Sequence, residues 1–257
     1  MQKSRHDARA ENRFRKRQHH SNQSQRRLAR DRVADTATYV ELDYSAYLEE
    51  SLRVQMEGNE LQISFREHTY PVIGSAYRAT VHVAHIEKID ADDAAKVQFE
   101  GEYTGDNLNI ELSDAAHCTG LVFTGQNCNI KMEDASVFTG FQFVGSTCKA
   151  ILEDASQFNG EIKVTEQLDV ELDDASRFVN KGTVTELTRL HLSNASLLNM
   201  AETQSSRMEV ELVSGSEATV QIIDSLSGTI QEASTLYYKG HPQINIDCSD
   251  DSQLIPL

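Results

Sequence analysis

A three-residue motif recurs at a fixed interval through most of the chain. Asp-Ala-Ser or a close variant begins at eight positions, which are Asp93, Asp114, Asp134, Asp154, Asp174, Asn194, Ser214 and Glu232. From Asp114 to Ser214 the interval is 20 residues without a slip, whereas the first interval is one residue longer and the last is two residues shorter. A constant interval of this size indicates a stack of similar structural units.

Each motif lies between two strand-like stretches. Leu108, Ile110 and Leu112 alternate with polar residues, and the same alternation recurs in residues 128–132, 168–172 and 208–212. A period of two predicts a strand with one buried face. After the motif comes a second short run, in which Phe138, Phe158 and Phe178 recur at the same interval. No helical period accompanies either run, so the fold class is all-β.

One such unit cannot bury its own apolar face. Coils of about 20 residues must therefore stack into parallel sheets with strands about 4.8 Å apart, which makes a β-solenoid. A leucine-rich repeat has a similar period, but no unit here offers a helix for its convex side. We predict about eight coils in residues 91–257. The motif would turn the corner of each coil, with alanine in a tight inward position where a larger side chain would collide. These corner residues are Ala115, Ala135, Ser136, Ala155, Ser156, Ala175, Ser176, Ala195 and Ser196.

The residues before the solenoid divide into two parts. Residues 34–90 include a predicted hairpin, with Arg53–Glu57 and Glu60–Phe65 joined by Gly58-Asn59. We expect this part to be a small N-terminal β cap over the open end of the solenoid. Residues 1–33 have almost no apolar side chains and should be a disordered arm.

The net charge of −16 is an average of two unlike segments. Residues 1–33 hold 11 of the 24 Lys and Arg and 3 of the 40 Asp and Glu, a local charge of +8; the remainder carries −24. The acidic body argues against nucleic acid as its partner. The basic arm could be a polybasic tail for nucleic acid or anionic lipid, or a solvated tail without a partner. No apolar run is long enough to be a transmembrane helix.

With these features the sequence resembles the head GIN domain family of auto-transporter adhesins from Bacteroides-like bacteria. The similarity covers residues 35–257. It rests on the hairpin from Val54 to Ile63, on the Ala-Ser corners, and on a C-terminal signature formed by Tyr238, Gly240 and Pro242. The resemblance implies a right-handed parallel β-helix, a location at the cell surface or in the periplasm, and no established enzymatic activity. The first residues lack the apolar stretch of a secretory signal, so a cytoplasmic location also stays open.

Acidic residues at the corners are the candidate metal ligands. Asp114, Asp134, Asp154 and Asp174 fall in one column, and oxygen ligands from adjacent coils would suit Ca²⁺. We favour a different role, in which each aspartate caps its own turn by accepting backbone N–H bonds. Cys128 and Cys148 share an inward column in adjacent coils and are expected to touch as free thiols rather than form a disulfide. No cofactor is predicted.

The sequence favours a binding scaffold over an enzyme. A carbohydrate-active β-helix needs clustered carboxylates in a groove. Here one outward column is mixed and shallow, with the residues Glu111, Lys131, Ile151, Glu171, His191 and Glu211. The favoured function is a non-enzymatic surface or periplasmic scaffold that binds a glycan or a protein. A cytoplasmic, self-assembling protein similar to bactofilin is the second hypothesis, and a carbohydrate-active enzyme is the third.

Overall fold

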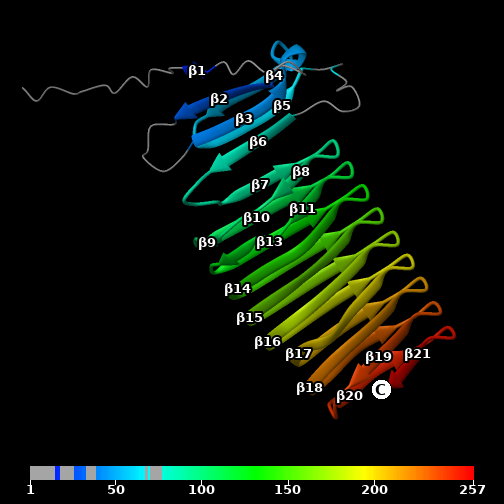
Figure 1. The fold of residues 1–257 in the computed structure, drawn as a ribbon. Coiled ribbons are helices and arrows are strands. Elements are labelled where there is room, and N and C mark those ends of the chain that lie inside the picture. Colours follow the sequence, from blue (N-terminus) through cyan, green and yellow to red (C-terminus); the bar gives the residue numbers. More distant parts are fainter. Residues whose placement is uncertain (1–14, 18–25, 33–38, 67–68, 70–76) are drawn as a thin grey trace, which may run out of the picture. The chain divides into compact units, whose positions relative to one another are not determined.

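The computed structural model describes residues 15–17, 26–32, 39–66, 69 and 77–257 (Figure 1). The chain divides into two compact units, Met1–Ala84 and His85–Leu257, and each is described by itself.

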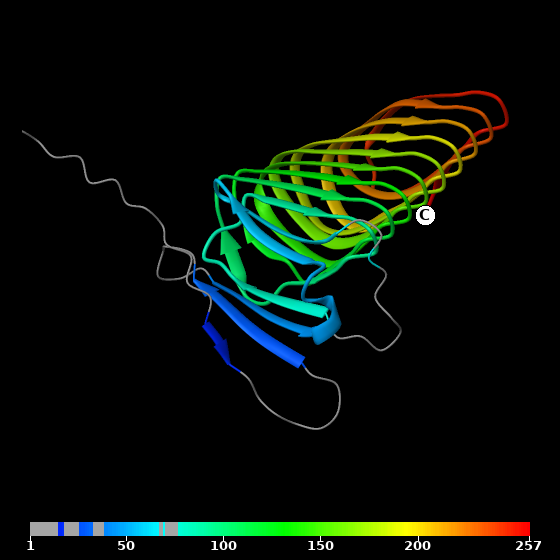
Figure 2. The same ribbon diagram turned by 90° about the horizontal axis from the view of Figure 1, so that it is seen from above.

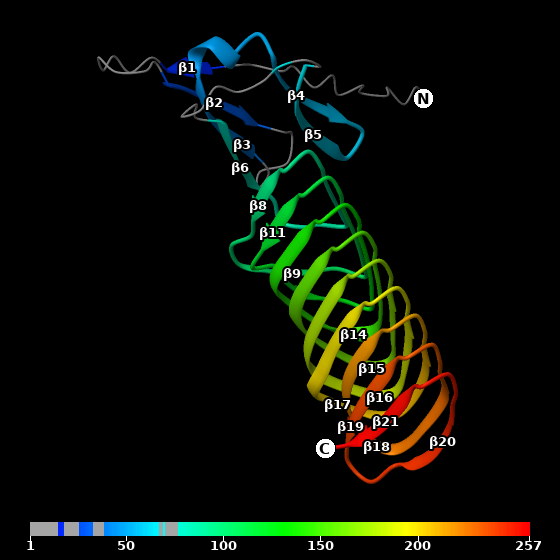
Figure 3. The same ribbon diagram turned by 90° about the vertical axis from the view of Figure 1, so that its right-hand side faces the viewer.

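The second unit is a β-solenoid of about eight turns, as the repeat predicts. Its strands are β7 (Lys88–Ala91), β8 (Lys96–Gln98), β9 (Glu102–Thr104), β10 (Asn107–Leu112), β11 (His117–Thr119), β12 (Val122–Thr124), β13 (Asn127–Met132), β14 (Val137–Leu152), β15 (Gln157–Leu172), β16 (Arg177–Leu192), β17 (Leu197–Leu212), β18 (Glu217–Ile230), β19 (Thr235–Lys239), β20 (Gln243–Cys248) and β21 (Gln253–Pro256). Figures 1 and 3 show successive coils stacked along one axis, and Figure 2 shows that each coil is flattened.

The coils are in register with the sequence repeat. In the column that begins at Leu108, the partners on successive parallel strands are Cys128, Cys148 and Leu168. The other inward columns are also in register, so the interior consists of ladders that are mostly apolar, with buried polar residues such as Thr188 at some positions. Phe158 and Phe178 are stacked with ring centroids 4.7 Å apart, and Phe138 meets Phe158 edge to face at 6.1 Å.

The corners have an unusual backbone. Both residues at the tip of each turn adopt positive φ, for example Asp154 at 53° and Ala155 at 62°. Left-handed backbone costs a non-glycine residue about 1–2 kcal/mol, so each corner must be stabilised by its surroundings. The compensation is a backbone hydrogen bond between coils. The amide of Ala135 donates to the carbonyl oxygen of Asp154 at 2.8 Å, and the amide of Ala155 donates to that of Asp174 at 2.8 Å.

The prediction that corner alanines point inward is wrong. Ala135, Ala155, Ala175 and Ala195 are exposed, and Ala115 is half-buried. Two successive left-handed residues form a tight turn whose tip faces solvent, so the inward position falls on the next residue. That residue is a buried serine in most coils, which form a serine ladder of Ser136, Ser156, Ser176, Ser196, Ser216 and Ser234.

A ninth corner also escaped the sequence analysis. Asp250 and Asp251 have φ of 55° and 59°, and the amide of Ala233 donates to the carbonyl oxygen of Asp250 at 2.8 Å. The signal for this corner is Asp-Asp-Ser, placed 18 residues after Glu232-Ala-Ser.

The first unit contains two small antiparallel sheets. The hairpin is confirmed as β4 (Leu52–Glu57) and β5 (Glu60–Phe65), joined by a two-residue turn with Gly58 at φ 64°. A four-stranded sheet has the order β1-β2-β3-β6. Its strands are β1 (Arg15–Arg17), β2 (Arg26–Arg32), β3 (Tyr39–Ser45) and β6 (Tyr77–His82), and η1 (Ala46–Leu48) follows β3. Buried Val40, Leu42, Tyr44 and Leu48 form its core. The capping role of this unit stays a prediction.

Part of the predicted basic arm is strand. The segment expected to be disordered contains β1 and β2, and all seven residues of β2 pair with β3. Low hydrophobicity predicts that a segment cannot form its own core. It does not prevent the segment from adding a backbone hydrogen-bonded strand to a sheet whose core lies elsewhere. The boundary between the two units falls after Ala84, six residues before the predicted start of the solenoid coils at residue 91.

Replacing two serines of the ladder by alanine should affect the free energy of unfolding differently. The Ser136 hydroxyl lies 3.2 Å from the Leu112 carbonyl oxygen and 3.3 Å from Ser156 Oγ, whereas Ser196 Oγ is buried without a hydrogen-bond partner. Ser136→Ala should lower the free energy of unfolding by about 1 kcal/mol, and Ser196→Ala should leave it unchanged or raise it by up to about 1 kcal/mol. Urea unfolding measures both. Equal losses at the two positions would contradict this assignment of the hydrogen bonds.

The four cysteines should differ sharply in reactivity. Cys118, Cys128 and Cys148 are buried free thiols, and Cys248 is exposed. Burial raises the pKa of Cys118 to about 12, and burial together with the Cys148 thiol raises that of Cys128. Because thiolate is the reactive form, alkylation of the folded protein should add one group, and unfolding without reductant should expose all four thiols. Intact-mass spectrometry counts the groups. Two thiols that stay unlabelled after unfolding would instead reveal a disulfide.

Candidate functional site

The four corner aspartates do not form a site together with other ligands. Asp114, Asp134, Asp154 and Asp174 are exposed at separate turn tips. Within the part of the chain that the structure describes, no three His, Cys, Asp or Glu side chains are grouped to hold a metal ion. Nor do these four carboxylates make a hydrogen bond there, so the capping we favoured is not found. The corner bonds come from the backbone instead.

The C-terminal signature residues have a structural explanation. Tyr238 lies in β19, and Gly240 begins the turn toward β20 with φ of 110°. A Cβ atom on Gly240 would lie 2.0 Å from the carbonyl oxygen of Ile222, which is far inside contact distance. Glycine is therefore needed where the chain passes close to the preceding coil.

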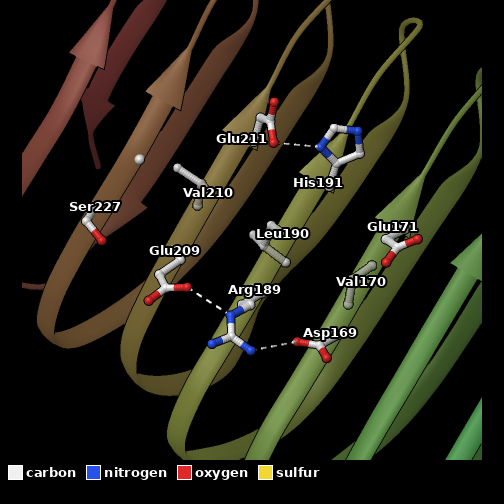
Figure 4. Close-up of a pocket in the computed structure, with 11 residues that line it drawn as sticks. Asp169, Val170, Glu171, Arg189, Leu190, His191, Glu209, Val210, Glu211 and Ser227 are labelled. Atoms are coloured by element: carbon white, nitrogen blue, oxygen red, sulfur yellow. Dashed lines mark hydrogen bonds and ion pairs between the residues drawn. The ribbon is translucent and has the colours of Figure 1, made fainter.

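A hollow on the outward face of β15–β18 is the strongest candidate for a binding site (Figure 4). Its volume is about 430 Å³. The lining residues come from corresponding positions of four successive strands, and Val170, Leu190 and Val210 among them have side chains buried in the core. They are Asp169, Val170 and Glu171 from β15, Arg189, Leu190 and His191 from β16, Glu209, Val210 and Glu211 from β17, and Ser227 and Gly228 from β18.

A short residue on β18 leaves this space open. Ser227 pairs in register with Glu209, and Gly228 pairs with Val210. Gly228 has φ of 132°, and a Cβ atom there would lie 1.8 Å from the Val210 carbonyl oxygen. Gly228 is opposite the inward Val210, and Thr229 is opposite Glu211. The short outward residue of β18 is Ser227, and it leaves space beside the longer Glu209.

Arg189 is the centre of an ion-pair network across three strands. Its Nε lies 2.9 Å from Glu209 Oε2 on one side, and its Nη1 lies 3.9 Å from Asp169 Oδ1 on the other. The hydrogen bond to Glu209 raises the pKa of the guanidinium. Gln167 Nε2 donates to both Asp169 oxygens, at 2.8 and 2.7 Å. These contacts hold the guanidinium in one place, but solvent-exposed pairs of this kind contribute little to stability.

The second outward column of the hollow is centred on a histidine. His191 is in register between Glu171 and Glu211, and its Nδ1 lies 3.1 Å from Glu211 Oε2. Glu171 in turn is 2.8 Å from Lys149 Nζ.

The hollow is thus acidic on balance and rich in hydrogen-bonding groups. Four carboxylates line it against one guanidinium and one imidazole. Such a surface can accept hydrogen bonds from hydroxyl, amide and ammonium groups of a ligand, and Arg189 can donate to one.

Sequence reasoning identified half of this arrangement. The column with Glu171, His191 and Glu211 is the outward column recognised from the repeat, and it was interpreted there as a mixed, shallow face. The neighbouring column with Asp169, Arg189 and Glu209 was missed, although the same 20-residue alignment, applied two residues earlier, places these three side by side. Of the buried cysteines, Cys128 and Cys148 do lie in register on adjacent strands, as predicted.

Comparison with solved structures shows the same fold in two bacterial proteins. A putative adhesin from Parabacteroides merdae matches with a TM-score of 0.54 and 13% sequence identity, over 87% of this chain and 85% of the other. A putative lipid binding protein from Parabacteroides distasonis matches with a TM-score of 0.53 and 14% identity, over 87% of this chain and 86% of the other. The comparison with curated protein sequences gives no significant match.

The family comparison agrees with the repeat and the signature. Residues 33–242 match the family described as "Putative auto-transporter adhesin, head GIN domain". No helix among the described residues is long and apolar enough to cross a membrane. The matched region spans the hairpin, most of the solenoid and the Tyr-x-Gly-x-Pro signature, and the chain therefore belongs to the head GIN domain family.

Proposed function

We propose that this protein is a non-enzymatic scaffold of the cell surface or periplasm that binds a polar ligand, a glycan or a protein, in the hollow over β15–β18. Membership of a family described as adhesins supports the class of function. The observation that carries the location is the ion-pair network of Arg189, Asp169 and Glu209, which lies next to the open space at Ser227 and Gly228.

The solenoid suits such a function because its hydrogen-bonded backbone fixes the spacing between outward residues. Successive outward residues in a column lie on adjacent hydrogen-bonded strands, so they are spaced by about 4.8 Å along the stack. Glu171, His191 and Glu211 are spaced in this way, and so are Asp169, Arg189 and Glu209. Two parallel rows of polar groups with fixed spacing form a preorganised surface, and preorganisation reduces the entropic cost of binding.

The charge of the hollow indicates the chemistry of the ligand. With four carboxylates and one guanidinium, the site favours hydroxyl and amine groups over phosphate or sulfate. An amino sugar within a polysaccharide, or a lysine-bearing protein segment, has this chemistry.

A binding screen with matched variants tests the proposal. The full chain is applied to an array of immobilised amino-sugar glycans and extracellular matrix proteins. The site variant combines Arg189→Gln and His191→Gln. The control variant combines Arg177→Gln and His117→Gln, which removes the same two residue types from exposed positions on β16 and β11. Binding to a positive spot should fall at least about tenfold in the site variant, as for a residue at the centre of an interface.

The control variant should bind within about twofold of the unaltered protein, because surface substitutions outside a contact cost little. Equal losses in both variants would place the ligand elsewhere on the solenoid. Saturable binding to no member of the array, or release of free sugar from a glycan spot, would contradict the scaffold function.

A further inference from the structure

The last coil that the structure describes has strands with one open edge. Figure 1 shows β20 and β21 at the end of the stack. Among the described residues β20 pairs only with β18 and β21 only with β19, whereas a strand such as β16 pairs on both sides. An open strand edge can pair with another chain unless the sequence prevents it.

The apolar interior is uncovered at this end. Ile244 pairs in register with Leu226, which is fully buried, but its own exposed fraction is 44%. Cys248 pairs with the fully buried Ile230 and is exposed as well. Ile246, between them, is half-buried. Apolar side chains in core positions therefore face the solvent, and a partner that extends the stack would bury them.

The backbone of β20 also has unpaired groups on this side. In a parallel pair, alternate residues direct both their N–H and their C=O group to the same neighbouring strand. The amide of Ser249 donates to the carbonyl oxygen of Ile230 at 3.0 Å, so Ser249 belongs to the set that faces β18. The other set, Ile244, Ile246 and Cys248, therefore directs its amides and carbonyls away from β18.

The edge of β21 is protected by a proline, and the edge of β20 is not. The amide of Leu257 donates to the carbonyl oxygen of Tyr238 at 2.9 Å, so the residue before it, Pro256, faces away from β19. Proline has no N–H to donate at that position, and this is a common protection of edge strands. The sequence of β20 is Gln-Ile-Asn-Ile-Asp-Cys, without proline. β20 is therefore the strand that can accept a partner.

The charges around β20 favour a second copy of the same strand. Lys239 and His241 are exposed just before the strand, and Asp250 and Asp251 are exposed just after it. If two copies of β20 pair in the antiparallel direction, the acidic corner of each copy lies beside the basic turn of the other. Unlike charges then meet at both ends of the pair, which favours this orientation over a parallel one.

We propose that two copies of this chain associate by antiparallel pairing of β20 with β20, about a two-fold axis at Ile246. In this register Ile246 lies opposite its own copy, and Ile244 lies opposite Cys248 of the second copy. All residues whose backbone groups face away from β18 then form hydrogen-bonded pairs. Asn245 lies opposite Asp247, so its amide can donate to a carboxylate. A register centred on Asp247 would instead place two carboxylates opposite each other, which is unfavourable.

This contact closes on itself. A two-fold contact uses the same surface on both subunits, so it produces a dimer rather than a filament. It therefore differs from the open self-assembly considered from the sequence. It is also separate from the ligand site, because the substitutions that test it share no residue with those of the array screen.

Sedimentation equilibrium of the full chain, over a range of protein concentrations, measures the association. The test variant Ile246→Pro removes an amide that faces away from β18 and leaves the hydrogen bonds to β18 in place, and edge strands tolerate proline at such positions. The control variant Ile246→Val keeps the amide. The dissociation constant of the dimer should rise at least about tenfold in the proline variant, because a carbonyl of each copy loses its donor. The valine variant should resemble the unaltered protein, and circular dichroism should show that both variants are folded.

Disulfide trapping tests the register without a change in the backbone. Ile244→Cys would place a thiol opposite Cys248 of the second copy, at a Cα separation of about 5.5 Å, which suits a disulfide. Asn245→Cys is the matched control, because it changes the next residue, which lies opposite Asp247. Mild oxidation and non-reducing electrophoresis should show a covalent dimer for the first variant and much less for the second. Alkylation of Cys248 should become slower as dimers form, and it should still reach one group per chain because dimers dissociate.

Four results would overturn the inference. One is an unaltered protein that stays monomeric at every concentration. Another is the same dissociation constant for the proline and valine variants. The third is equal trapping of the two cysteine variants, and the fourth is assembly into filaments or other species larger than a dimer. If the proline variant does not fold, the trapping experiment decides alone.

Discussion

The backbone hydrogen bonds between coils are the interaction on which the rest of the structure depends. No coil has a core of its own, and each acquires one only when its neighbours lie in register. The corner between strands extends this register, because its left-handed residues donate a backbone hydrogen bond to the next corner. The left-handed backbone conformation is unfavourable by itself, but it occurs at nine corners because stacking of the coils stabilises it. The apolar ladders, the serine ladder and the outward rows of charge all follow from the same register.

Sequence reasoning predicted the elements that repeat and missed what depends on the shape of the turn. Alternating residues such as Leu108, Ile110 and Leu112 identify a strand face without further information, and they are buried as expected. The direction in which Ala155 points could not be predicted in the same way. Composition shows that a small residue is needed near the corner, but only the positive φ of two successive residues shows that the turn tip faces solvent and that Ser156 is the inward residue.

In the candidate site, too, the repeating part was predicted from the sequence and the non-repeating part was not. The outward column through His191 was predicted from the repeat, since equal spacing places Glu171 and Glu211 beside it. The hollow was not predicted, because it depends on a departure from the repeat. The coil between Ser214 and Glu232 is two residues shorter than the five coils before it, and β17 and β18 shift register between Met200 and Gln204. The short Ser227 side chain then leaves Glu209 of β17 beside open space.

A deletion of one whole repeat tests the central claim most directly. Removing residues 175–194 joins Asp174 to Ala195 and restores an Asp-Ala-Ser corner, so every remaining coil keeps its register. Removing half that length, residues 175–184, breaks the register of all later coils. Far-ultraviolet circular dichroism with urea unfolding should show a cooperative β-rich protein for the first deletion and loss of that transition for the second. Equal disruption by both deletions would contradict the claim that the 20-residue coil is the unit of this fold.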